Sequence, residues 1–422
     1  MRALLGDEDL EQWRLALEAT PPCSVRENPS HQRGLPHSDP VPWCRLGHYL
    51  PQRPVFTLDP LFHAGAYYVQ EASSMLVEQA FKTTGLEGQK VVALDLCAAP
   101  GGKSGLLRTL LHPSSLLISN EVNPARAEVL AENLWKQGAQ NTLITRLQAT
   151  YFGQWKEYFD LVMLDAPCSG EGLMRKDRFA RQQWTPRLVD KCAVLQSALL
   201  EDAWKALRPG GHLIYSTCTW STEENELQID AFAQRNAAAV VPIPVHDTWK
   251  VRTSPLGLRC YPHECRGEGF FLSLLRKPGN PPRPAINSDA ASYLLEQNGV
   301  VHMLSSEWWP TAMRLYEVNQ AFVPGLPIAR SERGRWVPHA VAAYSRTAQA
   351  RLGGLLSFSV LDLDATQALT VLRGESPRSG DAQGWALARF QGAGLAWLKG
   401  AGTRWNNHLP KPWRIRMRTG GV

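Results

Sequence analysis

Short apolar runs alternate with amphipathic segments through residues 89–277 of this 422-residue chain. Each run is long enough for one buried strand and ends at a turn or a polar residue. Five runs are expected to be strands, at residues 90–96, 116–121, 141–147, 160–165 and 211–216, with a late strand at 269–275. The segments 125–136 and 188–207 are expected to be helices. Continuous apolar strands separated by helices predict an α/β fold, with a parallel sheet covered on both faces.

The pattern changes on both sides of this core. Repeated prolines between residues 21 and 60 argue against long helices, so residues 1–62 are expected to form an N-terminal α+β segment, with a helix near its start. The core is expected to span 63–277. A Pro-rich stretch begins at Lys277, and residues 278–287 are expected to be a linker. Residues 288–372 are expected to form a mixed α/β domain, and 373–422 a small β domain with Gly turns.

Several features of the sequence bear on the cellular location of the protein. No stretch of about 18 uncharged apolar residues is present, so no membrane span is expected. The first residues become acidic after one short apolar pair, which is not typical of a secretory signal. The eight cysteines have no disulfide-framework spacing. These features favour a reducing, cytoplasmic location.

The positive charge is concentrated at the C-terminal end. The net charge is +6, and residues 372–422 carry nine Lys/Arg against two Asp/Glu, whereas the remaining residues hold 36 basic and 37 acidic residues. Several tryptophans lie among these basic residues. A basic surplus with interleaved aromatic rings favours a nucleic acid over a merely solvated basic surface.

A loop of small residues follows the first expected strand. Small side chains let the backbone approach a ligand, and the helix that follows presents free N–H groups. Gly102-Lys103-Ser104 matches the end of a phosphate-binding P-loop, but that motif requires a glycine where Cys97 stands. Glu121 ends the second strand, where a carboxylate can accept hydrogen bonds from both ribose hydroxyls. A ribose carboxylate with no demand for phosphate suggests S-adenosylmethionine; the alternative is that Glu121 is a charge at a helix start.

Two cysteines follow the fourth and fifth expected strands, which are consecutive along the chain. Asp165 and Cys168 come at the end of the fourth strand and Cys218 at the end of the fifth. Adjacent strands lie about 4.8 Å apart, so both thiols would face one cleft if these strands are neighbours. Methylation of a pyrimidine at carbon 5 needs such a thiol, because a thiolate must first add to carbon 6. The alternative, an inert buried cysteine, is favoured for the other thiols at Cys23, Cys44 and Cys192.

A metal site is not expected. Cys260, His263 and Cys265 lie close together in the sequence, but no second pair stands nearby at the spacing of a structural zinc site. Arg259, His263 and the glycines at 267 and 269 are expected to form a turn at the edge of the cleft.

Together these segments resemble the Nop/Sun family of RNA cytosine-C5 methyltransferases. The resemblance rests on ordered motifs at 26–29, 66–75, 95–104, 120–121, 160–176, 215–226, 262–263 and 267–271. The tail at 394–413 resembles the PUA-like module of the bacterial, RsmF-like branch that acts on 16S ribosomal RNA. The resemblance implies a Rossmann-like, S-adenosylmethionine-dependent core at 63–277, RNA binding by residues 1–62 and a PUA-like RNA-binding domain at 373–422.

The resemblance also assigns roles to residues. It implies that Cys218 is the nucleophile and that Cys168 helps to release the product; the residues alone leave this choice open. The resemblance further implies that nine residues contact the cofactor or lie next to it: Cys97, Ala98, Ala99, Pro100, Gly101, Gly102, Lys103, Glu121 and Asp165. One departure stands at the end of the third strand, where the family usually has an aspartate near the adenine and this chain has Gln148.

The resulting hypothesis is an RNA cytosine-C5 methyltransferase. The Cys218 thiolate adds to C6 of an exposed cytosine, Asp165 stabilises charge at the N3/N4 edge, and Cys168 assists when Cys218 is eliminated. The enzyme is expected to be a monomer that needs no metal. Its expected partner is 16S rRNA or the small ribosomal subunit. The alternatives are a tRNA methyltransferase, a non-catalytic rRNA-binding assembly factor and a P-loop NTPase.

Overall fold

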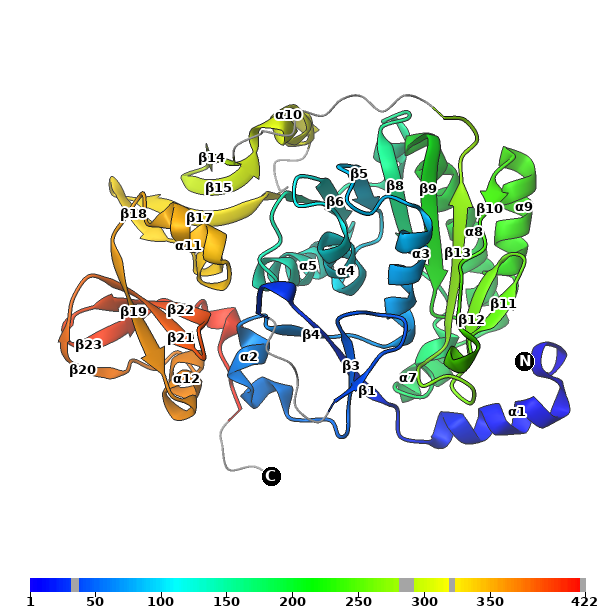
Figure 1. Ribbon diagram of the computed structural model, residues 1–422, viewed down its shortest axis with the longest axis horizontal. Coiled ribbons are helices and arrows are strands. Elements are labelled where there is room, and N and C mark those ends of the chain that lie inside the picture. Colours follow the sequence, from blue (N-terminus) through cyan, green and yellow to red (C-terminus); the bar gives the residue numbers. More distant parts are fainter. Residues whose placement is uncertain (32–37, 281–291, 319–322, 418–422) are drawn as a thin grey trace.

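A central sheet organises the computed structural model, which describes residues 1–31, 38–280, 292–318 and 323–417 (Figure 1). The sheet order is β11-β12-β13-β9-β8-β5-β6-β7-β16, with β10 paired to β13. The five predicted strands are β5 (Val92–Asp95), β6 (Leu116–Asn120), β7 (Thr142–Thr145), β8 (Phe159–Asp165) and β9 (Leu207–Thr217). All their mutual pairings are parallel. The late strand is β13 (Phe270–Arg276), which runs antiparallel beside β9. The prediction of an α/β, Rossmann-like core is confirmed.

Short edge strands extend this sheet on both sides. Beyond β13 lie β12 (Gly257–Cys260), β11 (Arg252–Ser254) and β10 (Ala239–Val240). At the opposite edge, β16 (Val323–Pro324) pairs antiparallel with β7. Because β16 belongs to the C-terminal half of the chain, it joins that half to the central sheet.

Helices cover both faces of the central sheet. Alternate residues of each strand point to opposite faces, so Ala93 and Leu94 of β5 enter different cores. The first face carries α6 (Ala149–Gly153), α8 (Pro186–Ala206) and α9 (Glu226–Asn236), and the second carries α3 (Val77–Thr83) and α4 (Gly102–Leu110). Asn123 caps α5 (Pro124–Lys136) through the N–H of Arg126, and Thr185 caps α8 through the N–H of Leu188. Both helices begin with proline, as is common at the first helical position.

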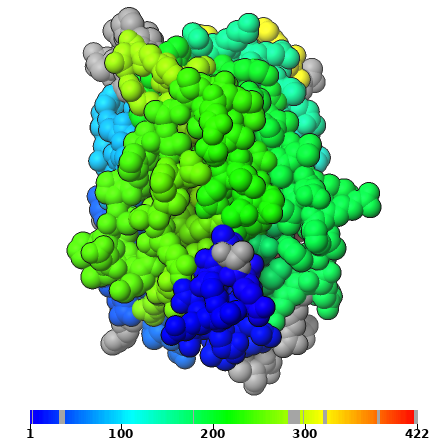
Figure 2. Space-filling view, turned by 90° about the vertical axis from the view of Figure 1, so that its right-hand side faces the viewer, coloured from blue at the N-terminus to red at the C-terminus, as the bar shows by residue number. Residues whose placement is uncertain are grey.

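The N-terminal segment packs at the end of the central sheet. It contains α1 (Arg2–Glu18), α2 (Pro60–His63) and a sheet of order β2-β3-β1-β4, formed by Asp39–Pro40, Gly47–Leu50, Cys23–Glu27 and Tyr67–Val69. Trp13 of α1 packs edge-to-face on Trp220, with ring centroids 5.3 Å apart. Figure 2 shows this helix in dark blue against the green surface of the central domain.

Two further sheets complete the C-terminal half. The first has the order β14-β15-β17-β18 (Ser292–Gln297, Val300–Ser305, Leu326–Glu332, Arg335–Pro338). The second has the order β19-β21-β22-β23-β20 (Phe358–Leu363, Trp385–Phe390, Ala393–Gly400, Gly402–Asn407, Arg378–Ala382), so it includes a strand from before residue 372. Helices α10 (Trp309–Val318), α11 (Arg346–Leu352) and α12 (Ala365–Leu372) accompany them, and short helical turns and α7 (Arg178–Gln183) lie elsewhere.

The tryptophans of the basic tail pack into the hydrophobic cores that lie against this second sheet. Trp385, Trp397 and Trp405 are 9%, 1% and 7% exposed, and the ring of Trp413 packs against the same cores. The three buried rings therefore form the core of a small domain rather than an exposed stacking surface. The basic side chains Arg404, Lys411 and Arg416 remain exposed.

Two expected features fall partly outside the described residues. Of the expected linker 278–287, residues 281–287 lie outside them, and so do residues 418–422 of the tail. Among the helices that the structure describes, none is both long enough and apolar enough to cross a membrane.

Candidate active site

A cavity of about 170 Å³ opens at the carboxyl ends of β5 and β8. This is the edge of a parallel sheet where ligands usually bind. Seven of its lining residues are among the predicted site residues: Cys97, Ala98, Ala99, Pro100, Gly102, Lys103 and Asp165. The structure therefore brings the predicted loop and the end of the fourth strand together around one space.

The loop after β5 is closely packed around its glycines. Gly101, the residue before α4, has φ of 108°, a conformation that favours glycine. A Cβ atom on Gly102 would lie 3.1 Å from the ring of Tyr68, across the cavity. The small residues in this loop thus keep its backbone close to the space that a ligand would fill.

The lysine and serine of this loop bind carboxylates rather than pointing to a phosphate site. Lys103 Nζ lies 2.8 Å from Asp165 Oδ2, and Ser104 Oγ donates to Asp95 Oδ2 at 2.6 Å. Burial disfavours the charged amine, but the pair with Asp165, together with the nearby Cys218 and Asp95, raises the pKa of Lys103. Together with Cys97 in place of the P-loop glycine, this arrangement argues against a P-loop NTPase.

Asp95 lies buried at the end of β5 and lines the cavity. Its Oδ1 atom has no hydrogen-bond partner among the described residues. Burial, with a smaller contribution from the nearby Asp165 carboxylate, raises the pKa of Asp95 to about 7. A buried oxygen without a partner beside a cavity is free to accept a hydrogen bond from a ligand.

The two predicted thiols meet. Strands β8 and β9 are neighbours, as the expectation of one shared cleft required, and the sulfur atoms of Cys168 and Cys218 lie 3.2 Å apart. Both cysteines are free. Asp165 lies on the same sheet edge, and its Oδ1 atom accepts a hydrogen bond from Ser216 Oγ at 2.7 Å.

The surroundings of the two thiols differ. The hydrogen bond from Cys168, together with the positive charge of Lys103, lowers the pKa of Cys218 against the effects of burial and Asp165. The same hydrogen bond, burial and the carboxylate of Glu224 raise the pKa of Cys168. The N–H of Cys218 also donates to the sulfur of Cys168 at 3.4 Å, which acts in the opposite direction. Because Lys103 acts on Cys218 and Glu224 acts on Cys168, we take Cys218 as the thiol that ionises first.

Two glutamates join the loops that carry these thiols. Glu171 Oε2 accepts hydrogen bonds from Thr219 Oγ1 at 3.0 Å and from the N–H of Trp220 at 2.9 Å. Glu224 Oε2 accepts from the N–H of Ser169 at 3.0 Å. Each carboxylate therefore links the loop of one cysteine to the loop of the other.

A glycine sets how closely the same loops approach. The N–H of Gly172 donates to the carbonyl of Cys218 at 2.8 Å. A Cβ atom on Gly172 would lie 2.4 Å from the carbonyl oxygen of Gly269 and 2.8 Å from that of Cys218. Contacts this short exclude a larger residue unless a backbone segment moves.

Glu121 and Gln148 lie outside the lining of the cavity. The Glu121 carboxylate accepts a hydrogen bond from the N–H of Asn123 at 2.9 Å and pairs with Arg126 at 3.2 Å. Arg126 in turn donates to the carbonyl of Ala99, so Glu121 is tied to the loop. Gln148 is exposed at the start of α6. A ribose contact by Glu121 stays a prediction.

One wall of the cavity was not predicted. Tyr68, Val69, Gln70, Glu71 and Ser74, from β4 and the turn that follows it, face the loop after β5. Residues 66–75 carry a motif of the family resemblance, and this motif was the available signal. It contains no charged cluster or glycine-rich loop that would mark a cofactor wall by itself.

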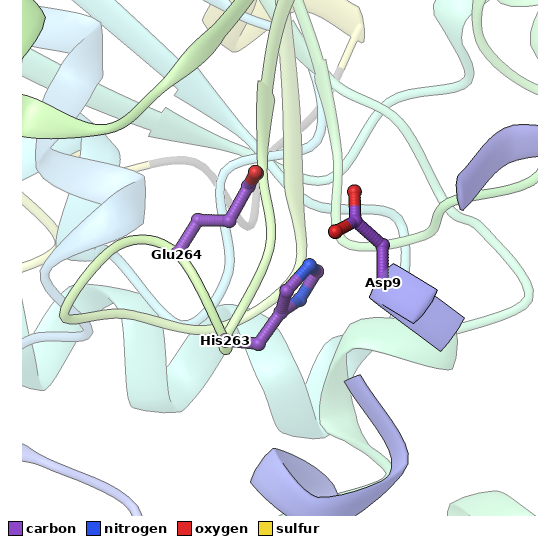
Figure 3. A group of neighbouring side chains, drawn as sticks. All are labelled: Asp9, His263 and Glu264. Atoms are coloured by element: carbon purple, nitrogen blue, oxygen red, sulfur yellow. The ribbon is translucent and has the colours of Figure 1, made fainter. Parts of the chain in front are cut away.

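A different group of side chains has ligand atoms spaced as a metal could require (Figure 3). His263 lies near Asp9 of α1 and Glu264, rather than forming a site with Cys260 and Cys265. Arg252 pairs with both carboxylates, at 2.5 Å from Asp9 and 2.8 Å from Glu264. The guanidinium of Arg252 bridges the two carboxylates, and its pair with Asp9 links α1 to the central domain.

Family models match three segments of the chain. Residues 86–276 match the family described as 16S rRNA methyltransferase RsmB/F, residues 1–72 the N-terminal domain of 16S rRNA methyltransferase RsmF, and residues 358–415 the methyltransferase RsmF PUA domain. The ribosomal RNA small subunit methyltransferase F of Vibrio cholerae is 31% identical over 412 residues, covering 88% of this chain and 85% of that protein. The chain belongs to the RsmF family.

Other relatives match part of this RsmF-family chain. The protein of the same description from Aeromonas hydrophila is 39% identical over 249 residues, and the match covers 57% of this chain and 52% of that relative. In that comparison the chain thus spans about half the length of its relative.

The solved structures agree on the fold. A methyltransferase homolog from Pyrococcus horikoshii is 26% identical with a TM-score of 0.54, covering 65% of this chain and 97% of that one. NSun6 from the same organism, solved with SFG, has a TM-score of 0.55 at 20% identity, covering 66% and 97%; at that identity it supports the fold alone.

Proposed function

We propose that this RsmF-family protein methylates carbon 5 of a cytosine in small-subunit ribosomal RNA, with S-adenosylmethionine as the methyl donor. The observation that carries this proposal is the pair of free thiols 3.2 Å apart at the ends of two adjacent parallel strands. One of them, Cys218, has a lowered pKa. A thiolate of this kind can add to carbon 6 of a pyrimidine, and the step makes carbon 5 nucleophilic.

The cavity beside the thiols fits the donor. Asp95 offers a buried oxygen without a partner, and Gly101 and Gly102 bring backbone close to the space. We assign cofactor contacts to the loop 97–103, to Asp165 and to Glu121, with the wall at 68–71 closing the site. When bound, S-adenosylmethionine supplies the methyl group.

The residues of the chain divide the remaining work. The Cys218 thiolate forms a bond to C6 of the cytosine. Asp165, held by Lys103 and Ser216, would accept a hydrogen bond from the N4 amino group of the base and, when protonated, would donate one to N3, where negative charge develops. After carbon 5 has been methylated, loss of the C5 proton to a base restores the ring and expels the Cys218 sulfur as a thiolate. Cys168, the neighbouring protonated thiol, can donate a hydrogen bond to that leaving sulfur.

The partner implied by this function is 16S rRNA or the small subunit. The three family matches include an RsmF N-terminal domain and an RsmF PUA domain, and exposed Arg404, Lys411 and Arg416 lie on the tail. These basic side chains can contact phosphates of either a free or an assembled RNA. We propose that the protein acts as a monomer in the cytoplasm and without a metal.

The direct test is methyl transfer from labelled S-adenosylmethionine. We expect label in 16S rRNA or small subunits, at a cytosine that bisulfite sequencing then identifies. Cys218→Ala should abolish the label while still binding the donor. Label in tRNA alone would favour the tRNA alternative. RNA binding without any label, on free RNA and on subunits, would favour a non-catalytic assembly factor.

A further inference from the structure

A second cleft, of about 420 Å³, lies between the N-terminal segment and the central domain. One wall comes from residues 20–23 and 50–53, and the other from Arg175, Pro262 and residues 265–267. We infer that this cleft binds the phosphate backbone of the RNA strand beside the target cytosine, an inference that rests on the proposed function. Three arginines and no carboxylate are among the described residues that line it.

The two exposed arginines come from opposite walls. Arg53 follows β3 in the N-terminal segment, and Arg266 lies in the loop between β12 and β13. Arg266 stacks over the ring of Tyr49, with its guanidinium carbon 4.2 Å from the ring centroid. Its ion pair with Asp39 spans 2.8 Å, but that carboxylate is 71% exposed. Exposed pairs of this kind contribute about 0–1 kcal/mol, so a phosphate can replace Asp39 at little cost.

The third arginine is fixed and links the cleft to the thiols. Arg175 has a side chain that is 5% exposed, with Nε 3.0 Å from Glu268 and Nη2 donating to the carbonyl of Gly267 at 2.8 Å. Arg175 lies three residues after Gly172, whose N–H bonds to the carbonyl of Cys218. The cleft and the proposed nucleophile therefore share one short, hydrogen-bonded loop.

The chemistry favours a nucleic acid backbone over a small anion. Guanidinium groups bind phosphate through two parallel hydrogen bonds, and they stand here on two walls of an open cleft. Arg53 and Arg266 project from exposed positions rather than converging in an enclosed pocket. An elongated polyanion that passes between the walls can meet both, and such contacts position the strand without reading its sequence.

Salt dependence of RNA binding tests the inference. We would compare the unchanged chain with the double variant Arg53→Ala/Arg266→Ala on a 16S rRNA fragment. Each lost phosphate contact should lower the slope of log K against log salt by about 0.7 to 0.9, so the double variant should lose about 1.5. Methyl transfer at saturating RNA should be retained, because neither residue lies at the thiols. Arg53→Lys/Arg266→Lys keeps both charges and should retain most of the slope.

The matched control is Arg235→Ala. The Arg235 side chain is 51% exposed, close to the 49% of Arg266, and it pairs with the carboxylate of Glu201, which is 36% exposed. It lies in the last turn of α9, and a helix that follows a parallel strand ends at the opposite edge of the sheet. We expect no change of slope for this variant.

The inference is overturned if the double variant keeps the slope of the unchanged chain, or if Arg235→Ala lowers it equally. Because binding is measured independently of methyl transfer, the two proposals fail separately. One outcome would separate them clearly. If the unchanged chain transfers no methyl group, but the double variant has a smaller salt dependence of RNA binding, the proposed function is contradicted and the role of this cleft is supported.

Discussion

The positive charge of Lys103 acts on two neighbours at the centre of the site. Its amine pairs with Asp165 and its charge favours the thiolate of Cys218. Cys168 instead faces the carboxylate of Glu224, which opposes its ionisation. The two cysteines thus differ in how readily they ionise, because different charged side chains surround them. Their positions in the sequence do not reveal this difference.

Asp95 should make stability depend on pH. Its pKa of about 7 in the folded chain lies above the ordinary value of 3.8, so the folded form holds a proton that the unfolded form loses. The stabilisation is complete at pH below about 4 and is lost as pH rises to about 7. Relative to Asp95→Asn, which cannot ionise, the parent should therefore lose stability across this range. Urea unfolding at several pH values measures the difference. The exposed change Asp230→Asn controls for lost charge, and a difference for Asp95→Asn that is constant with pH would contradict the assignment.

At the scale of elements, periodicity predicted the central sheet well. All five expected strands of the core are present, because buried parallel strands leave continuous apolar runs. The meeting of the thiols depends on the pairing of β8 with β9, which the order of strands along the chain does not determine. β16 was missed because two residues, Val323 and Pro324, carry no periodic signal. The wall at 68–71 was missed because tertiary packing of the N-terminal sheet, not local pattern, brings it to the cavity.

Arg26 joins the N-terminal sheet to the start of α4. It is 1% exposed, and its guanidinium donates to Gln70 Oε1 at 2.8 Å, Gln137 Oε1 at 3.1 Å and the carbonyl of Gly102 at 3.3 Å. Burial lowers the pKa of Arg26 to about 10. The side chain therefore ties β1 to the loop that lines the cavity.

Arg26→Ala should destabilise the chain. The change leaves three acceptors without their donor and a cavity in place of the side chain, so we expect a loss of about 2–4 kcal/mol in the free energy of unfolding. Binding of S-adenosylmethionine should weaken with it, because the backbone of Gly102 loses its support. Chemical denaturation and calorimetric titration measure the two effects. Arg351→Ala, an exposed change on α11, should shift stability by less than about 0.5 kcal/mol, and an equal loss for both variants would refute the role of Arg26.

For the whole molecule, the charge of the tail and its tryptophans serve different purposes. The rings of Trp385, Trp397 and Trp405 build a core, whereas the basic side chains stay outside. Composition predicted a basic C-terminal domain correctly but not the position of its aromatic residues. A small domain needs large side chains to bury enough apolar surface, and sequence alone does not distinguish these from stacking surfaces.

The exposed charges of the tail should contribute to RNA affinity. Replacing Arg404, Lys411 and Arg416 by alanine should weaken binding to 16S rRNA and lower its salt dependence, since each charge can displace a counterion. Thermal unfolding and donor binding should stay as in the parent. Filter binding over a range of salt concentrations measures the effect, and an unchanged slope would exclude these three residues from the RNA interface.

The central claim is that Cys218 attacks the base and Cys168 helps to release it. The most direct measurement is a denaturing gel of protein incubated with 16S rRNA and S-adenosylmethionine. We predict that Cys168→Ala accumulates a covalent protein–RNA band, and that Cys218→Ala forms none and transfers no methyl group. Accumulation of the band by Cys218→Ala, with its loss in Cys168→Ala, would contradict the account.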